Sequence, residues 1–452
     1  MAITSEAPPF RRAVLLVTVS SFLVPAAGVL TQPILARALG VEGRGELALA
    51  VAAPGLALAV ATLGLPEALV YYLAKHPRLT RPAVLLASLV VLGLGLVCLV
   101  ATYLATPFLS AKDPDLGGLI VLGMALTIPA LIVGVLRGAA TGRQMWGAVA
   151  VERLINTSLR VICLGLLLIV GELTVLTALL VGCLSPMVAG VVYLRLLKRP
   201  PTDRTEPALD GGLPRLLLSY GGRVWFGAVA SMLLARVGQL LMAPLSTVED
   251  LGLYTVATTI SDLPLVVALA IAGALHGVNS KSNDSTQVTT TARVTLLIGF
   301  IGCAVLGGTL PWWIRPLFGE EFGAAIIPTL ILLLSALICI PGLMAASGIA
   351  AWGRPGRRSI GLAVTLVSNI TVFVILVPAF GVIGACWTSI ISNVILTSFM
   401  VVVAARLMNE PVQSFFRVRA SDVKLAWREG ISLVQRGLGR IFVVKAANGR
   451  RA

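Results

Sequence analysis

Long apolar stretches separated by short polar turns dominate the pattern of this sequence. Residues 359–405 contain no charged side chain, and Pro378-Ala379-Phe380-Gly381 interrupts this stretch near its middle. At a helical rise of about 1.5 Å per residue, the stretch is about twice as long as a helix needs to be to cross the core of a bilayer. The pattern therefore predicts two membrane-spanning helices joined by a tight turn.

The same pattern recurs along the chain and predicts an all-α, polytopic membrane protein with twelve transmembrane helices. The apolar runs begin after Arg12, Gly45, Arg81, Asp115, Arg143, Leu173, Arg215, Asp250, Arg293, Glu321, Arg358 and Gly381. A proline-rich polar segment divides them, and we expect an N-terminal six-helix lobe at 1–198, a cytoplasmic linker at 199–215 and a C-terminal six-helix lobe at 216–406. Because six is an even number, the two lobes would be parallel repeats.

Two turns are weakly alike in the two predicted lobes. Gly40–Gly45 belongs to the first hairpin, and Ser246–Gly252 belongs to the hairpin of spans seven and eight. A helix rich in small residues and carrying a proline, Pro54 or Pro264, follows each turn. This likeness supports an internal repeat, although the equal number of spans is the stronger argument.

Composition and charge agree with a membrane protein and also indicate its orientation. Apolar residues make up 57% of the chain and charged residues only 12%, which excludes an ordinary soluble domain. If the N-terminus is inside, most Lys and Arg, including Arg137, fall in cytoplasmic segments. The segments expected outside hold only Arg37, Arg44, Lys112 and Arg315. By the positive-inside rule, both termini are then cytoplasmic, in a multi-pass protein of the cytoplasmic (inner or plasma) membrane.

The net charge of +15 is thus read as a signal of topology, and we expect no nucleic-acid partner. The cysteines all lie in apolar stretches and lack the spacing of a metal site or a disulfide framework. They are Cys98, Cys163, Cys183, Cys303, Cys339 and Cys386. The two histidines, His76 and His276, lie at predicted helix ends. We therefore expect neither a metal nor another cofactor.

The last segment, 407–452, leaves the predicted membrane region as a basic tail. From Ser421, with Asp422 placed to favour a helix start, apolar residues recur at helical spacing, with Lys and Arg on the remaining surface. Such an amphipathic helix would lie on an anionic inner leaflet. A partly disordered tail with solvated charges is the alternative.

Arginines within the spans are the candidate binding groups, because charges inside a bilayer are expensive and usually face a cavity or each other. In span five, Arg153, Asn156 and Arg160 share one helix face. Span seven adds Arg223, Arg236 and Gln239. Lining a central cleft from both sides, these residues would bind an anionic substrate, since arginine holds phosphate oxygens bidentately and stays charged.

A structural alternative stays open for these arginines. Glu152 or Asp262 would pair with an arginine only to hold helices together, and Arg223 would extend its charge to the inner interface. The same two acids, together with Glu67, are candidates for ion coupling, because buried carboxylates carry protons or bind sodium. Glu67 follows Pro66, so it has a second interpretation as the cap of a broken helix.

Three turns carry the pattern of a known family. Leu39–Gly45 follows span one, Pro316–Phe322 precedes span ten, and Leu376–Ala385 joins spans eleven and twelve. In this order, and with this number of spans, roughly residues 10–406 resemble the polysaccharide-biosynthesis flippases of O-antigen type. That family shares a superfamily with the multidrug and toxic compound extrusion transporters and the lipid II flippases.

The chain departs from the family pattern at three places. Many members have an aromatic residue where Arg44 stands, and many have an acidic residue after the arginine of span seven, where this chain has Arg236-Val237-Gly238-Gln239. The proline often found at the end of span eight is missing from Leu275-His276-Gly277-Val278. These departures leave the superfamily assignment unchanged and affect what the resemblance implies about the substrate and about ion coupling.

The resemblance implies a two-lobed bundle that alternates between inward-open and outward-open states. Its implied cargo is an isoprenoid-pyrophosphate-linked oligosaccharide for cell-surface polysaccharide synthesis. The expected partners are this lipid-linked anionic oligosaccharide, membrane lipids and polysaccharide-assembly proteins. No nucleophile or general acid is required, because flipping a lipid makes and breaks no covalent bond.

Three other functions are weighed against this one. A multidrug exporter of the same superfamily usually carries a lipophilic cation, for which an arginine-rich cavity is a poor host. A lipid II flippase would be expected to have two additional C-terminal spans. A membrane enzyme such as a polymerase or ligase would be expected to place catalytic groups on sizeable outer loops, whereas the predicted outer turns are short. We therefore predict a transporter that is not an enzyme.

Overall fold

The computed structural model describes residues 10–197, 212–282, 284–417, 419 and 422. These residues form α-helices and short 3₁₀ helices, and no strand occurs among them, which confirms the predicted all-α class. The α-helices are α1 (Phe10–Ala61), α2 (Leu65–Lys75), α3 (Thr80–Leu109), α4 (Pro114–Gly142), α5 (Trp146–Val170), α6 (Val175–Gly190), α7 (Leu213–Leu245), α8 (Val248–Ser282), α9 (Ser285–Phe318), α10 (Ile326–Ala351) and α11 (Pro355–Met408). The 3₁₀ helices are η1 (Pro77–Leu79), η2 (Val191–Leu197), η3 (Glu320–Ala325) and η4 (Val412–Phe415).

Helices α1 and α11 each consist of two helices that meet at one glycine. Gly40 has φ 66° and ψ −172°, and Gly381 has φ 54° and ψ −132°. Side chains disfavour a positive φ, and glycine adopts it readily. The predicted turn at Pro378–Gly381 is confirmed. The predicted first hairpin is confirmed as well, but its turn ends at Gly40, so residues up to Gly45 already belong to the next helix.

Within the described part of the chain, nine helical segments are long and apolar enough to cross a membrane. The protein is therefore a multi-pass membrane protein. The count of twelve spans and the cytoplasmic position of both termini stay predictions.

The chain packs as two compact units. Unit 1 comprises Met1–Thr259, Pro311–Pro328 and Asn369–Thr388, and unit 2 comprises Ile260–Leu310, Thr329–Ser368 and Ser389–Ala452. The division into two six-helix lobes stays a prediction. Most of the predicted linker lies outside the described residues, and so does the predicted amphipathic helix of the tail, apart from Asp422.

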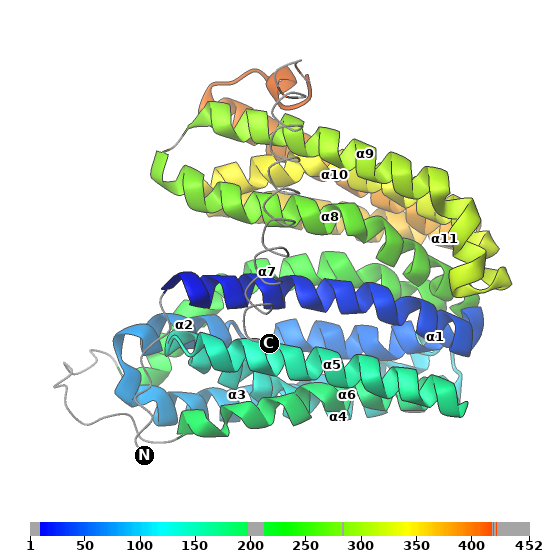
Figure 1. Ribbon diagram of the computed structural model, residues 1–452, viewed down its shortest axis with the longest axis horizontal. Helices are drawn as coiled ribbons and strands as arrows, with labels where there is room; N and C mark the ends of the chain where they lie inside the picture. The colour runs from blue at the N-terminus through cyan, green and yellow to red at the C-terminus, as the bar shows by residue number, and fades with distance from the viewer. Residues whose placement is uncertain (1–9, 198–211, 283, 418, 420–421, 423–452) are drawn as a thin grey trace, which may run out of the picture. The chain divides into compact units, whose positions relative to one another are not determined.

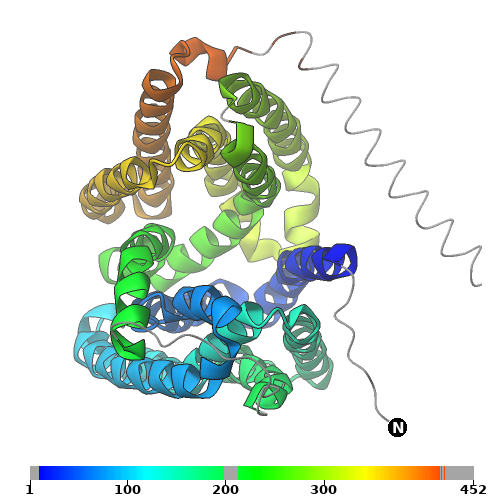
Figure 2. The ribbon, with the colours of Figure 1, turned by 90° about the vertical axis from the view of Figure 1, so that its left-hand side faces the viewer.

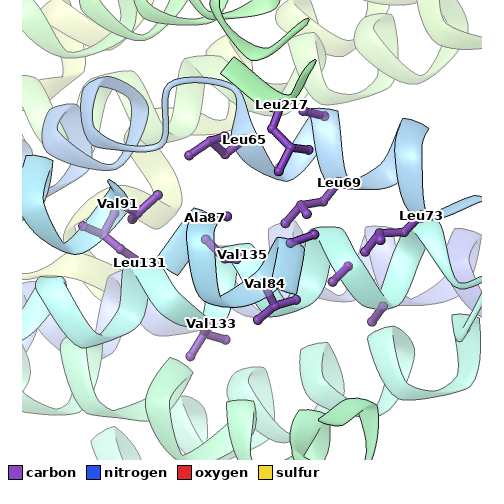
Figure 3. Close-up of a cluster of buried hydrophobic side chains, with 14 of the residues drawn as sticks. Leu65, Leu69, Leu73, Val84, Ala87, Val91, Leu131, Val133, Val135 and Leu217 are labelled. Carbon is purple, nitrogen blue, oxygen red and sulfur yellow. The ribbon is translucent and has the colours of Figure 1, made fainter. Parts of the chain in front are cut away.

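In unit 1, α1, α4, α5 and α6 lie side by side (Figure 1), and Figure 2 shows these helices along their axes. The largest core lies where α2 packs against α3, α4 and the start of α7. Leu65, Leu69 and Leu73 form a stripe at helical spacing on α2, and Val84 of α3 and Val135 of α4 lie close to it (Figure 3). All five side chains are at most 3% exposed, so this core fixes α2 in place.

Backbone contacts through glycine join other elements of unit 1. Gly64, with φ 66°, precedes α2, and a Cβ atom there would lie 2.4 Å from the carbonyl oxygen of Gly221 on α7. The two turns that are alike in sequence also meet. A Cβ atom on Gly45 would lie 1.9 Å from the carbonyl oxygen of Val248, and one on Gly252 would lie 2.0 Å from that of Val41. The contact is reciprocal, as expected for two related segments.

Unit 2 has its own apolar core and one buried ion pair. The core is built by α8, α9, α10 and the end of α11, with Ala268, Val288, Met344 and Met400 among its buried members. In the ion pair, Arg293 of α9 donates from Nε to Asp422 Oδ2 at 2.6 Å and from Nη2 to Asp422 Oδ1 at 3.3 Å. Its Nη1 donates to the carbonyl oxygen of Ser414 at 2.8 Å, so the pair anchors the start of the tail to unit 2.

Candidate functional site

The polar side chains of helix α5 differ in how deeply they are buried. Arg153 and Asn156 are half-buried and Arg160 is exposed, as expected for the predicted polar face. Glu152 is completely buried, at 0% exposed. The carboxylate of Glu152 is therefore enclosed by the helix bundle, whereas Arg160, two helical turns later, is exposed.

Glu152 belongs to a closed hydrogen-bonded cluster. Arg137 of α4 donates to it from Nε at 3.1 Å and from Nη2 at 2.8 Å, and the hydroxyl of Tyr193 in η2 lies 3.2 Å from its Oε2. Tyr193 is also fully buried. A bidentate arginine and a buried hydroxyl satisfy the carboxylate, so this cluster ties α4, α5 and η2 together.

A second arginine, Arg44, is buried without such a partner. It lies in the first turn of the second helix of α1, and only 3% of its surface is exposed. The fold at Gly40 brings it back against Gln32 of the first helix, and its Nη2 donates to Gln32 Oε1. Its Nε is buried and has no hydrogen-bond partner among the described residues. Arg44 therefore keeps an unused donor inside unit 1.

Arg160 of α5 is close enough to Arg44 for the two like charges to act on each other. Helix α5 packs against both α1 and α6, and Cys183 of α6 is also within electrostatic range of Arg160. Among the described residues, no ion pair joins a carboxylate to Arg44 or Arg160. Two guanidinium groups thus share one region of unit 1 with no acid to neutralise them.

Arg236 of α7, another predicted arginine, approaches α1 at a position beyond Arg44. Its Nη1 donates to Gln239 Oε1 at 2.8 Å, as their spacing on one helix face allows. A Cβ atom on Gly55 of α1 would lie 3.5 Å from Arg236 Nε. The guanidinium of Arg236 therefore lies beside α1 at Gly55, at a distance that would be ordinary contact for a Cβ atom.

Arg44 and Gly55 lie on the same face of the second helix of α1. They are eleven positions apart, and three helical turns take about 11 residues, or about 16 Å. One face of this helix therefore carries Arg44 near its start and meets Arg236 about three turns later. Arg44 and Arg236 thus place positive charge at two positions along α1, an arrangement that suits a phosphorylated or otherwise anionic ligand.

The remaining predicted residues are dispersed. Arg223 lies on α7, but its side chain is outside the described residues. Glu67 is exposed in the first turn of α2, where a negative charge favours the helix start. Asp262 is exposed on α8 in unit 2. Among the described residues, no group of three or more His, Cys, Asp or Glu could hold a metal ion.

Sequence reasoning missed two arginines. Arg44 was expected in an outer turn and Arg137 in a cytoplasmic segment, whereas both guanidinium groups reach inward within helices. The signal for Arg44 was present, because it stands where many members of the resembled family have an aromatic residue. No comparable signal marked Arg137, because the sequence pattern offers Glu152 a partner only among the arginines of spans five and seven.

A family model described as "Polysaccharide biosynthesis protein" matches residues 10–282, which is more than half of the chain. The chain belongs to this family. No curated protein matches the chain. The family match covers α1 to α8, and it therefore includes all three arginines of the candidate site and the cluster around Glu152.

Solved structures share the fold of this polysaccharide biosynthesis protein. An inward-facing multidrug resistance MATE family transporter of the MOP superfamily superposes with a TM-score of 0.66 at 16% identity, covering 88% of this chain and 98% of that chain. The lipid II flippase MurJ, in an inward closed conformation, superposes with a TM-score of 0.62 at 11% identity, covering 93% of each chain. At these identities the likeness establishes the fold of the described helices.

Proposed function

We propose that this protein is a flippase that moves an isoprenoid-pyrophosphate-linked oligosaccharide across the cytoplasmic membrane by alternating access. The observation that carries the proposal is the positive face of α1, which carries the buried Arg44 near its start and meets Arg236 about three turns later, while no carboxylate among the described residues forms an ion pair with Arg44 or Arg160. Family membership supplies the link to polysaccharide synthesis. A pyrophosphate is multivalent, so two levels of arginine can hold it at successive stages of its passage.

The proposed substrate-binding residues keep the roles that their chemistry suggests. Arg160 and Arg236 bind phosphate oxygens, and Gln239 orients Arg236 through its hydrogen bond. Arg153 and Asn156 extend the same face of α5, and Arg223 extends α7. Glu67, Asp262 and Glu152 remain candidates for ion coupling. Of these, Glu152 already accepts hydrogen bonds from Arg137 and lies within hydrogen-bonding distance of the Tyr193 hydroxyl.

The proposal is tested by replacing Arg160 or Arg236 with alanine in cells that depend on the protein. We expect both variants to reach the membrane and to lose export, so that one isoprenoid-pyrophosphate saccharide accumulates in the lipid extract measured by mass spectrometry. Lysine at either position should restore export only in part, because it keeps the charge and loses the planar fork. Arg315→Ala is the matched control, since Arg315 is 55% exposed beside Glu320.

Two outcomes would contradict the proposal. Wild-type export by both alanine variants would show that these arginines do not handle the substrate. An unchanged pool of lipid-linked saccharide on depletion, with increased sensitivity to cationic dyes, would favour a multidrug exporter, the function named for several proteins of this fold. Accumulation of lipid II instead would identify a function like that of MurJ.

A further inference from the structure

The end of α11 in unit 2 borders an open cavity that contains none of the residues proposed above to bind the substrate. The cavity has a volume of about 600 Å³ and lies between the last turns of α11 and the segment that follows them. Its lining combines apolar and polar side chains, among them Val402, Ala405, Val412, Arg406, Asn409 and Glu410.

Hydrogen bonds and a buried side chain fix the wall of the cavity that follows α11. Asn409, with φ 53°, ends the helix, and the backbone amide of Glu410 donates to a carbonyl oxygen of α11 at 2.9 Å. Phe415 is 0% exposed and belongs to the core of unit 2, and Arg293 donates to a carbonyl oxygen of η4 at 2.8 Å. The cavity is therefore built between two elements that are held in place.

Two charged side chains of this cavity keep hydrogen-bonding capacity for a ligand. Arg406 is exposed, and it forms no hydrogen bond or ion pair with another described side chain. Glu410 is half-buried, and its Oε1 accepts from the hydroxyl of Ser285 at 2.9 Å, while no described residue donates to its Oε2. One cavity thus holds a positive and a negative group that do not neutralise each other.

The sequence places the cavity at the edge of the hydrocarbon. Arg406 is the first charged residue after the uncharged stretch 359–405. Exposed positions recur every four residues before it, at Val394, Ser398 and Val402. From Val394 to Arg406 the helix rises about 18 Å, whereas one leaflet takes up about half of a core of roughly 30 Å. A lipid chain along this exposed stripe would therefore cross one leaflet and end at Arg406.

We propose that this cavity binds the headgroup of phosphatidylethanolamine from the surrounding bilayer. The guanidinium of Arg406 binds the phosphate, for which arginine has the matching planar fork. The carboxylate of Glu410 accepts a hydrogen bond from the ammonium group through Oε2, and the acyl chain lies against Val402. Phosphatidylcholine has no N–H group to donate to Glu410, and phosphatidylglycerol has no cation. The pair of opposite charges therefore selects a zwitterionic lipid whose cation is a hydrogen-bond donor.

The inference is independent of the proposed flippase activity, because the lipid is a component of the bilayer and is not the cargo. Its test is thermal unfolding of the purified full-length protein in phosphatidylcholine nanodiscs, alone or with added phosphatidylethanolamine or phosphatidylglycerol. We expect phosphatidylethanolamine to raise the wild-type Tm most, because a ligand that binds only the folded state stabilises it. Export is not part of this measurement, so failure of one proposal is distinguishable from failure of the other.

Arg406→Gln should abolish the rise in Tm with phosphatidylethanolamine. Titration with a short-chain phosphatidylethanolamine in detergent should show binding weakened by about tenfold or more, the loss expected when a charge-assisted hydrogen bond disappears. Arg417→Gln is the matched control, because Arg417 is an exposed arginine just after η4 that does not line the cavity. Arg406→Lys keeps the charge, should bind with intermediate affinity, and serves if Arg406→Gln does not fold.

Glu410→Gln tests the choice of headgroup. Glutamine keeps an oxygen for the hydroxyl of Ser285 and loses the negative charge, so this variant should bind phosphatidylglycerol at least as tightly as phosphatidylethanolamine. A merely structural role for Glu410 would lower Tm in phosphatidylcholine alone and leave the order of the lipids unchanged.

Three results would overturn the proposal. Phosphatidylethanolamine would fail to raise the wild-type Tm above its value in phosphatidylcholine, or the rise would persist in Arg406→Gln. A rise shared by the wild type, Arg406→Gln and Arg417→Gln would be an effect of the bilayer itself. Finally, an equal or larger rise of the wild-type Tm with phosphatidylglycerol would assign the cavity to anionic lipids.

Discussion

Two groups of residues that include arginines differ in whether a carboxylate neutralises the positive charge. Arg137 donates hydrogen bonds to both oxygens of the Glu152 carboxylate, and the Tyr193 hydroxyl lies within hydrogen-bonding distance of one of them. Arg44 is buried with one amide oxygen as its acceptor, and no acid among the described residues forms an ion pair with it or with Arg160. The first cluster holds three elements together, whereas the second is left open to a ligand.

An arginine within a membrane span therefore does not by itself indicate a binding site. The decisive observation is whether a carboxylate completes its hydrogen bonds. A saturated arginine contributes to stability, and removing its partner is costly. An arginine without such a carboxylate lowers stability, and a role in binding a substrate explains its presence in a membrane span.

The largest effect is expected when the saturated cluster is broken. Arg137→Leu leaves Glu152 buried with only the Tyr193 hydroxyl, and the free energy of unfolding should fall by about 3 kcal/mol. Thermal unfolding in detergent measures this loss. Adding Glu152→Leu should restore most of the stability, since an apolar pair replaces a buried ion pair. A double variant as unstable as the single one would show that the pair is not the origin of the loss.

Arg293 of unit 2 is also paired with a carboxylate, and the pH dependence of stability tests what that pair contributes. The hydrogen bonds from Arg293 lower the pKa of Asp422 below its ordinary value. The carboxylate therefore contributes stability above its unfolded pKa of about 4, and this contribution is lost as the pH falls through the lower folded pKa. We expect Asp422→Asn to be less stable than the wild type at neutral pH by about 2 kcal/mol.

The difference between the two proteins should shrink as the pH is lowered below about 4, because the wild-type carboxylate then becomes neutral as well. Unfolding temperatures of both proteins across a pH series check this expectation. A difference that stays constant down to strong acid would mean that the charge of Asp422 is not what stabilises the wild type.

The smallest effect, and one of opposite sign, is expected when the open cluster is converted into a closed one. Arg160→Glu would place a carboxylate near Arg44, and stability should rise by about 1 kcal/mol. Export should disappear, because the counter-charge is then built in. Arg160→Gln, which removes the charge without supplying a new one, is the matched control. Equal stability of the two variants would show that Arg44 and Arg160 are too far apart to pair.

The sequence predicted the class of fold and the glycine breaks, and it placed Arg160 and Arg236 on suitable helix faces. These features follow from local rules: apolar length, helical periodicity and the tolerance of glycine for positive φ. The pairing of Arg137 with Glu152 could not be predicted, because it depends on the packing of α4 against α5. The approach of Arg236 to Gly55 equally requires the contact between α1 and α7.

By itself, then, the sequence determined an all-α membrane protein with arginines inside its spans and a turn at Gly381. Family membership rests on the same linear pattern, which is why it was accessible before the fold. Only the tertiary structure decided which arginines are neutralised. An ion pair forms between side chains a few ångströms apart, and residues such as Arg137 and Glu152 acquire that proximity only when the helices have packed.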